Sequence, residues 1–413
     1  MKKLAFLSCC FIIAQTAFAQ TSGGQIVRKK SSQQIQSTPK TGNKNTRTKY
    51  RDDKNQFKYY STYNFQEGLA LVQSFNHKFG FINKNGKEII PCKYEMAGDF
   101  CEGLARVRLN DKYGYIDKNG REVFPPCGYS YAFDFNEGLA CVRAGISYGF
   151  IYKNGEEVIP CKYEYDSKFS EGLSCVKING KYGYIDKMGC EVIPCKYESA
   201  SNFVDGLAPV EFNGKYGYID KMGREVIPCK YENALKFSEG LAGVKNNGKY
   251  GYIDKMGREV IPFKYDYVIA RMQWDRYISC NFSEGLASVR VNGKHGFIDK
   301  TGRVVVPYKY DEVFPFCEGL ARVYIKDKGC GFVDTSGREI IPCRYPYAES
   351  FSEGLALVGD QRGKMGFIDK NGRIVIPCKY DVAKSFREGF AAVNYGGKWG
   401  FIDKTGKPLL LKN

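Results

Sequence analysis

The chain repeats one short sequence ten times. Residues 214–232 read GKYGYIDKMGREVIPCKYE, and residues 248–266 differ from them only by Cys to Phe and Glu to Asp. A glycine in a Gly-Leu-Ala-type step marks each unit, at positions 68, 103, 138, 172, 206, 240, 285, 319, 354 and 389. The spacing is 34 or 35 residues except for one of 45, so one unit carries an insertion of about eleven residues. This period indicates small units that bury a shared core.

The content of the unit predicts short β-strands rather than paired helices. Glycines and a proline recur in each unit and leave no stretch long enough for two helices. Residues 173–178 alternate between apolar and polar side chains, and Asn179-Gly180 is the dipeptide that a two-residue type I′ hairpin favours. Residues 181–186 then form the returning strand.

A second turn and a third strand complete the expected unit. Lys187-Met188-Gly189 suits a three-residue turn with glycine in the left-handed position. Residues 191–193 form a short strand that Pro194 is expected to end. Each unit is therefore predicted to be an antiparallel meander that depends on its neighbours for a core.

The predicted fold is an all-β tandem array of about ten meanders. An open superhelical solenoid is the preferred architecture, because propellers usually have four to eight blades and this chain has ten units with an insertion. The alternative is a closed, propeller-like ring, in which an extended piece such as Cys-Lys-Tyr-Glu supplies a fourth strand. The last unit ends in PLLLKN without the Cys-Lys-Tyr step, so it is expected to cap the array.

The amino-terminal part differs from the array. Residues 1–19 combine two lysines, an apolar run and Ala-Phe-Ala, which predicts a secretory signal peptide. Residues 20–62 form a polar, basic stretch that is expected to be a flexible linker, and residues 63–413 form the array. The protein is expected to be exported, to the periplasm or the cell surface, with no membrane-spanning segment once the signal is removed.

Charge argues against a nucleic-acid partner. The first 62 residues hold twelve basic and two acidic residues, so they carry +10 of the net +17 and leave +7 for the array. A nearly balanced array lacks the basic surface that nucleic acids require.

The repeats resemble the WG (KWG) repeats of bacterial envelope and secreted proteins. Lys398-Trp399-Gly400, followed by FIDKTGK, is the signature as it stands in this chain, and the resemblance covers residues 57–413. Other units replace the tryptophan before the glycine, with Phe79, Tyr113, Tyr148, Tyr182, Tyr216, Tyr250, His295, Cys330 and Met365. The resemblance implies a repeat protein and little about its activity.

Fourteen cysteines follow the predicted signal peptide. Six come directly after proline, at Cys92, Cys161, Cys195, Cys229, Cys343 and Cys378. Phe263 and Tyr308 occupy the same position in other units, so the position requires apolar volume. Buried free thiols are therefore preferred over scattered disulfides and over a metal site, and no metal or cofactor is expected.

Each unit also repeats a carboxylate before the marker glycine, at Glu67, Glu102, Glu137, Glu171, Asp205, Glu239, Glu284, Glu318, Glu353 and Glu388. A row of carboxylates could bind cations, but the preferred interpretation is that each accepts backbone N–H groups at its own turn. Asp186 and Asp220, which open the later turn, are interpreted in the same way.

Few residues suit catalysis. The two histidines are His77, at a hairpin turn, and His295, in an aromatic position. No nucleophile elbow, phosphate loop or zinc-ligand spacing is present. A glycosidase that uses two carboxylates is the remaining enzyme class, but every acidic residue belongs to a repeated set. No catalytic residue is expected.

Aromatic residues and the insertion are the best candidates for binding. A tyrosine follows the Cys-Lys step in most units, at Tyr94, Tyr163, Tyr197, Tyr231, Tyr265, Tyr310, Tyr345 and Tyr380, and either packs in the core or stacks on sugars. The insertion, at about 266–279, brings together types that are enriched at interfaces: Arg271, Met272, Trp274, Arg276 and Tyr277. We therefore expect an exported, non-catalytic scaffold for protein–protein interaction in the cell envelope, with a glycan such as peptidoglycan as the alternative partner.

Overall fold

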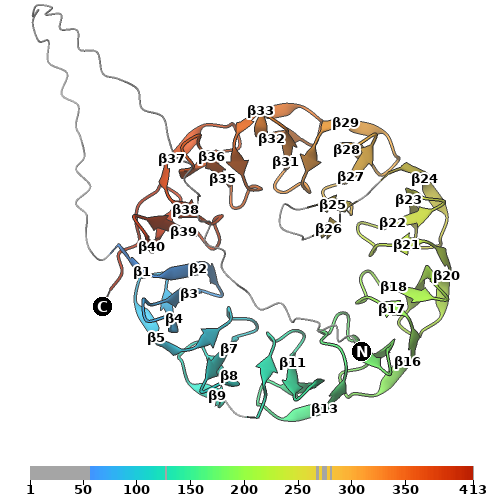
Figure 1. Cartoon of the computed structure of the whole chain (residues 1–413), viewed down its shortest axis with the longest axis horizontal. Coiled ribbons are helices and arrows are strands. Elements are labelled where there is room, and N and C mark those ends of the chain that lie inside the picture. Colours follow the sequence, from blue (N-terminus) through green and yellow to red (C-terminus); the bar gives the residue numbers. More distant parts are fainter. Residues whose placement is uncertain (1–55, 126–127, 267–268, 272–276, 280, 413) are drawn as a thin grey trace, which may run out of the picture. The chain divides into compact units, whose positions relative to one another are not determined.

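The repeats form ten antiparallel blades arranged in a ring, a ten-bladed β-propeller (Figure 1). The structure is a computed structural model that describes residues 56–125, 128–266, 269–271, 277–279 and 281–412. The predicted signal peptide and most of the predicted linker lie outside these residues. The all-β prediction is confirmed. The preferred open solenoid was wrong, and the alternative, a closed ring, matches the structure.

The first five blades run from β2 to β20. Blade 1 contains β2 (Ser61–Gln66), β3 (Leu69–Gln73), β4 (Phe79–Asn83) and β5 (Glu88–Tyr94). Blade 2 contains β6 (Met96–Ala97), β7 (Leu104–Leu109), β8 (Lys112–Asp117) and β9 (Glu122–Phe124). Blade 3 contains β10 (Tyr131–Ala132), β11 (Leu139–Ala144), β12 (Ser147–Tyr152) and β13 (Glu157–Tyr163). Blade 4 contains β14 (Ser174–Ile178), β15 (Lys181–Ile185) and β16 (Glu191–Tyr197). Blade 5 contains β17 (Ser199–Ala200), β18 (Leu207–Phe212), β19 (Lys215–Asp220) and β20 (Glu225–Tyr231).

The other five blades run from β21 to β40. Blade 6 contains β21 (Asn233–Ala234), β22 (Leu241–Asn246), β23 (Lys249–Asp254) and β24 (Glu259–Tyr265). A separate hairpin, β25 (Ile269–Arg271) and β26 (Tyr277–Ser279), precedes blade 7, which contains β27 (Leu286–Val291), β28 (Lys294–Asp299) and β29 (Val304–Tyr310). Blade 8 contains β30 (Glu312–Val313), β31 (Leu320–Ile325), β32 (Gly329–Asp334) and β33 (Glu339–Tyr345). Blade 9 contains β34 (Tyr347–Ala348), β35 (Leu355–Gly359), β36 (Met365–Asp369) and β37 (Ile374–Tyr380). Blade 10 contains β38 (Val382–Ala383), β39 (Phe390–Tyr395), β40 (Lys398–Asp403) and, from the other end of the array, β1 (Phe57–Tyr59).

The turns follow the predicted chemistry. Asn179 and Gly180 both have positive φ, 49° and 76°, as a type I′ hairpin requires. Gly189 has a φ of 81°, and the Oδ1 atom of Asp186 accepts the N–H groups of Met188 and Cys190 at 2.9 Å. These local predictions are confirmed.

The proline of each unit does not end its strand as expected. In blade 5, β20 continues through Pro228 to Tyr231 with a bulge, and Tyr231 lies opposite Tyr216 of β19. The strand tolerates proline because it is the outer edge strand of its blade, where one N–H needs no partner (Figure 1). The Cys-Lys-Tyr step thus extends the outer strand, and a two-residue inner strand such as β17 completes most blades.

Adjacent blades share their hydrophobic cores. One cluster of buried residues combines Leu241, Tyr252 and Ile261 of blade 6 with Phe282 and Val289 of blade 7, and equivalent clusters join the other blades. Tyr252 and Phe282 meet edge to face, with ring centroids 5.1 Å apart. A blade therefore buries its apolar side chains against the next blade rather than within itself.

The repeated glutamates connect the blades. Each lies at a positive φ, between 50° and 56°, which is unfavourable for a residue with a side chain. Its carboxylate accepts the N–H of the glycine at the same turn of the next blade: Glu67 from Gly103, Glu102 from Gly138, Glu137 from Gly172, Glu171 from Gly206, Glu239 from Gly285, Glu284 from Gly319, Glu318 from Gly354, Glu353 from Gly389 and Glu388 from Gly68. The expectation that each carboxylate caps its own turn was wrong, because the neighbouring turn presents its N–H within reach.

The same interactions close the ring between its two ends. Glu388 of blade 10 accepts the N–H of Gly68 of blade 1 at 2.9 Å and pairs with Lys84 at 3.0 Å. The rings of Phe65 and Phe401 lie 5.0 Å apart, like the aromatic pairs between other blades. Blade 1 therefore packs on blade 10 as any blade packs on its neighbour.

Residues Phe57–Tyr59 supply the step that the last unit lacks. β1 pairs with β40, and Tyr59 lies opposite Trp399 as Tyr231 lies opposite Tyr216. Phe57-Lys58-Tyr59 thus takes the place of Cys-Lys-Tyr, so the last unit is completed rather than serving as a cap. The array begins earlier than the expected boundary at residue 63. In the described part of the chain, no helix is long and apolar enough to span a membrane.

Replacing Tyr59 by alanine is expected to destabilise the ring. Tyr59 is 3% exposed and belongs to the strand that joins the two ends of the array. We expect the free energy of unfolding to fall by about 3–5 kcal/mol, the usual cost of truncating a buried aromatic residue. Tyr60→Ala, at an exposed neighbouring residue, is the control, with an expected change of about 0.5 kcal/mol. Equal effects in urea denaturation would contradict the role of β1.

The contribution of Glu388 is expected to depend on pH. Burial opposes its ionisation, but hydrogen bonds from Lys84 and from the Gly68 N–H outweigh burial and lower its pKa. Its stabilising effect should be complete above the unfolded-state pKa, about 4.3, and should be lost as the pH falls through the folded-state value.

Glu388→Gln should therefore cost about 1 kcal/mol at pH 7 and much less near pH 3. Glu259→Gln, at an exposed residue of β24, is the control. Thermal unfolding of both variants at the two pH values makes the comparison. If the loss of unfolding free energy in Glu388→Gln does not change with pH, the negative charge of Glu388 does not contribute to stability.

Candidate functional site: the inner wall of the ring

Two positions of the repeat change in chemical class from blade to blade. They precede a phenylalanine that is buried in every blade, at Phe65, Phe100, Phe135, Phe169, Phe203, Phe237, Phe282, Phe316, Phe351 and Phe386. The first position reads Tyr63, Gly98, Phe133, Ser167, Ser201, Leu235, Cys280, Phe314, Glu349 and Lys384. The second reads Asn64, Asp99, Asp134, Lys168, Asn202, Lys236, Asn281, Pro315, Ser350 and Ser385. We call the surface formed by the described residues at these two positions the inner wall, because in most blades they lie in or directly after the inner strand (Figure 1).

Blade 4 departs from the repeat at residue 166. The equivalent residues Ala132, Val313 and Ala348 are at most 1% exposed, and Ala97, Ala200 and Ala234 are half-buried, whereas blade 4 has Asp166, which is half-buried. An unpaired carboxylate is too costly to bury in such an apolar position. In blade 5 Ala200 pairs with Val210, but within the fully described blade 4 no inner strand forms. Blade 4 thus lacks an inner strand where an aspartate replaces a small residue, and the wall is incomplete there.

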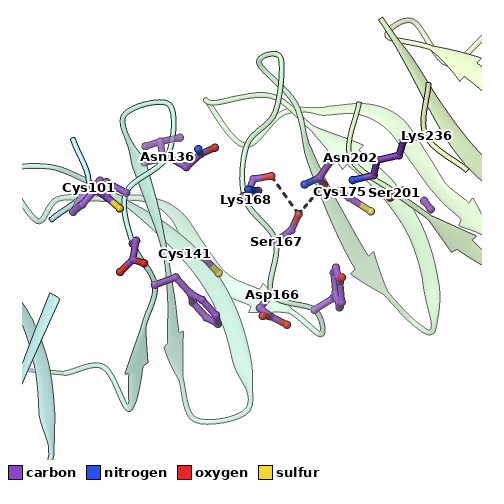
Figure 2. Close-up of a pocket in the computed structure, with 16 residues that line it drawn as sticks. Cys101, Asn136, Cys141, Asp166, Ser167, Lys168, Cys175, Ser201, Asn202 and Lys236 are labelled. Carbon is purple, nitrogen blue, oxygen red and sulfur yellow. Dashed lines mark hydrogen bonds between the residues drawn. The ribbon is translucent and has the colours of Figure 1, made fainter. Parts of the chain in front are cut away.

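A cavity of about 490 Å³ opens where the inner strand is missing. Figure 2 shows Lys168 of blade 4, Asn202 of blade 5 and Lys236 of blade 6 along one side of the cavity, with Ser167 between Lys168 and Asn202 and Asp166 on the other side. The Ser167 hydroxyl lies 3.4 Å from the Oδ1 atom of Asn202. The cavity is thus formed by consecutive blades and lined largely by polar side chains.

The charges of this cavity are only partly compensated. Asp134 pairs with Arg106, with 3.1 Å between Oδ1 and Nε. Within the described chain, by contrast, the ammonium groups of Lys168 and Lys236 have no hydrogen-bond or ion-pair partner. Burial, and then the charge of Lys168, lower the pKa of Lys236. The cavity therefore presents the half-buried ammonium of Lys236 and the exposed ammonium of Lys168, with the carboxylate of Asp166 as a partial counter-charge.

The cysteines of the cavity are unsuited to nucleophilic chemistry. Burial raises the pKa of Cys141 and of Cys175 to about 12, so both are neutral thiols at pH 7. Within the described residues no group of three potential metal-ligating side chains occurs.

A second cavity, of about 370 Å³, lies on the inner wall at blades 8–10. The guanidinium of Arg322 stacks 3.4 Å from the ring centre of Phe314 and donates to the carbonyl of Ala348. The Ser385 hydroxyl donates to Glu349. The side chains of Arg322, Phe314 and Glu349 are thus held in place around this cavity by contacts with their neighbours.

Lys384 occupies the wall where the ring closes. Its Nζ donates to the carbonyl of Thr62 at 2.7 Å and lies 4.0 Å from the ring centre of Tyr63. Burial lowers its pKa to about 8, against the opposing effect of Asp99 and Glu349. This lysine links the last blade to the first.

The insertion forms a hairpin, and the residues expected to bind a partner are only partly described. β25 pairs with β26, so the backbones of Arg271 and Tyr277 lie opposite each other at its end. Met272, Trp274 and Arg276 lie outside the described residues. The hairpin contacts β27 and β30 and projects to the inner side of the ring (Figure 1).

Other repeated side chains have structural positions. The tyrosines after Cys-Lys are buried, at 0–4% exposure for Tyr94, Tyr163, Tyr197, Tyr231, Tyr265, Tyr310 and Tyr380, and Tyr345 is half-buried, which confirms their core role. Cys195, Phe263 and Tyr308 each pack against a core cluster from the same repeat position, which confirms the need for apolar volume. The cysteines at residues 92–125, 128–266 and 281–412 are free, as expected, but those after proline are half-buried rather than buried.

His295 behaves as a substitute aromatic residue. It lies opposite Tyr310 and is 8% exposed, and burial lowers its pKa to about 4. It is therefore neutral at pH 7.

Comparison with known proteins identifies the repeat. The family described as "WG containing repeat" matches residues 79–113, 113–145, 148–182, 182–216, 216–250, 250–270, 296–328, 331–364 and 365–399. The chain belongs to the WG repeat family. No curated protein matches it.

Solved structures resemble this WG repeat protein only loosely. The designed protein Ika8 has 11% identity over 84% of this chain and 96% of its own, with a TM-score of 0.37. BamB from Moraxella catarrhalis has 11% identity over 64% and 90%, with a TM-score of 0.36. Hsv2p from Kluyveromyces lactis has 9% identity over 56% and 89%, with a TM-score of 0.33. Likenesses this distant say nothing about function.

The glycine of the WG signature is required by the bulged outer strand. A Cβ atom on Gly217 would lie 2.5 Å from the carbonyl oxygen of Ile227, and one on Gly400 would lie 2.3 Å from that of Gln56. The preceding aromatic position meets no such limit, so Tyr, Phe, His, Cys and Met can replace Trp there.

Sequence reasoning missed the inner wall, although its signal was present. The variable pair before the buried phenylalanine, and an aspartate at a position otherwise held by small apolar residues or threonine and serine, are both visible once the units are aligned. The insertion was emphasised instead because its residue types are frequent at interfaces.

Replacing Asp166 by alanine is expected to complete blade 4. Alanine fits the buried position, so the Ser167 N–H should bond to the Cys175 carbonyl as the Ser201 N–H bonds to Pro209 at 3.2 Å. We expect a gain of about 1 kcal/mol in unfolding free energy and slower hydrogen exchange at Ser167. Asp166→Asn, which keeps a polar group, should show neither. If the two variants behave alike, Asp166 is not the cause of the missing inner strand and of the cavity.

Proposed function

We propose that this WG repeat protein is an exported, non-catalytic scaffold that binds a protein partner on the inner wall of its ring in the cell envelope. One observation carries the proposal. The two wall positions differ in chemistry between blades, while the buried positions of the same blades repeat. Residues that shape the fold have little freedom to vary, so variation at the wall is what a specific partner would require.

The chemistry of the wall suits a protein better than a glycan. Its residues combine aromatic, acidic, basic and apolar types, such as Tyr63, Asp99, Leu235 and Lys384, which protein interfaces also combine. The tyrosine row that could have stacked on sugars is buried between blades instead. These facts favour the protein partner.

The repeated reactive side chains support a non-catalytic role. The glutamates join blades through their carboxylates, as Glu137 does with Gly172 at 3.0 Å. His295 is buried and neutral, and the thiols of the cavity are protonated at pH 7. The side chains of the inner wall are therefore suited to binding a partner. The signal-like amino terminus supports export.

The β25–β26 hairpin extends the proposed surface. It contacts β27 and β30 from the inner side of the ring, beside the wall residues of blades 7 and 8 (Figure 1). We include residues 266–279 in the binding surface because the hairpin faces the same space.

Site-specific crosslinking in cells tests the proposal. A photoreactive benzoyl-phenylalanine is placed in the full chain at Ser350 or at Tyr63 of the wall. The matched control is Val226, which is 40% exposed on outer strand β20. We expect one protein adduct of the same mass from both wall positions and none from Val226, and a weaker adduct after deletion of residues 266–279. Adducts from Val226 alone, or none from the wall, would refute the proposal.

A further inference from the structure

The two lysines of the blade 4 cavity differ from the lysines of the Ile-Asp-Lys turns and from Lys384. Lysines of the Ile-Asp-Lys turns pair with glutamates, as Lys187 pairs with Glu137 at 3.2 Å, and Lys384 donates to a carbonyl. Lys168 and Lys236 have no such partner in the part of the chain that the structure describes. Both occupy the position before the buried phenylalanine, in blades 4 and 6, with Asn202 at the same position of blade 5. The wall thus presents two cations with an amide between them.

Both lysines line the same cavity, and the charge of one affects the other. Charge repulsion from Lys168 contributes to the lowered pKa of Lys236, after the larger effect of burial. A half-buried cation that faces another cation gains most from an anion that contacts both, because the anion offsets desolvation and repulsion together. The cavity is therefore better suited to a charged ligand than to an uncharged one.

Neutral donors complete the arrangement. The Oδ1 atom of Asn202 lies 3.4 Å from the hydroxyl of Ser167, which directs the amide Nδ2 atom of Asn202 away from that contact. Figure 2 shows the Lys168, Asn202 and Lys236 side chains on one side of the cavity and Asp166 on the other. The carboxylate of Asp166 reduces the net charge of the cavity to about that of one cation, which favours one carboxylate group, with a single charge, over a phosphate dianion.

We propose that this cavity is a carboxylate-binding site, in which the ammonium groups of Lys168 and Lys236 and the amide of Asn202 hold a carboxylate group. The inference rests on the proposed function, because it assigns a ligand chemistry to one part of the inner wall. The volume of about 490 Å³ exceeds that of a small ion and accommodates an acidic side chain or a small organic acid. The carboxylate comes either from a polypeptide or from a free acid.

Titration of the full chain tests the site. Its lysines are labelled by reductive ¹³C-methylation, which keeps their charge, and their NMR signals are followed during addition of glutarate or of a hexapeptide of glutamate. We expect saturable shifts of the Lys168 and Lys236 signals and a rise in the pKa of Lys236 on binding. If the hexapeptide binds more tightly than glutarate, the natural carboxylate comes from a polypeptide. If glutarate binds more tightly, it comes from a free acid. Neutral glutaramide should leave both signals unchanged.

Variants give the decisive comparison. Lys168→Gln combined with Lys236→Gln should weaken carboxylate binding about tenfold or more. Lys215→Gln, at an exposed lysine outside the cavity, should leave it unchanged. Asp166→Ala, which restores the inner strand, should also abolish binding while the protein stays folded.

Three results would overturn the inference: no saturable shift at Lys168 and Lys236, unchanged affinity in the double variant, or tighter binding of inorganic phosphate than of glutarate. Failure here with intact crosslinking at Ser350 and Tyr63 would remove the carboxylate site alone. Absence of crosslinking from Ser350 and Tyr63 in a chain with no other substitution would instead reject the proposed function.

Discussion

A blade of this ring has no hydrophobic core of its own, and the rest of the structure follows from that constraint. Each buried cluster combines side chains from two adjacent blades, such as Tyr252 and Phe282. An open array would leave an uncovered apolar face at each end, whereas a ring leaves none. Closure thus gives the terminal blades the same environment as the others, down to the contact of Phe65 with Phe401.

Polar interactions set the alignment of neighbouring blades. A glutamate at positive φ is unfavourable by itself, but there its carboxylate reaches the glycine N–H of the next blade. Hydrophobic contact is non-directional and fixes no register, whereas these hydrogen bonds allow one relative position. The repeated carboxylates therefore contribute to the geometry of the ring.

Function, in this view, lies where the repeat is broken. Blade 4 has Asp166 in place of a small residue and lacks an inner strand, and a cavity lined by Lys168 and Lys236 opens there. The insertion adds the β25–β26 hairpin on the inner side of the ring. A closed array can tolerate such local departures because each blade is held from both sides. The inner strands are short and contribute little to the shared cores, so the loss of one inner strand costs little stability.

The sequence by itself determined the unit, its hairpins, and the core roles of the tyrosines and of the cysteines after proline, because these depend on local backbone preferences and on side-chain volume. It also contained the closing strand, since Phe57-Lys58-Tyr59 is the step missing from the last unit, but that match has meaning only if the two ends meet. Tertiary structure decided that they meet, that each glutamate bonds to the next blade and not to its own turn, and that the variable pair faces inward. These outcomes depend on distances between residues that are remote in sequence or in adjacent repeats, and local patterns do not encode such distances. The cavity depends on tertiary structure in the same way. The energetic cost of burying the Asp166 carboxylate arises only when the neighbouring blades are packed around it.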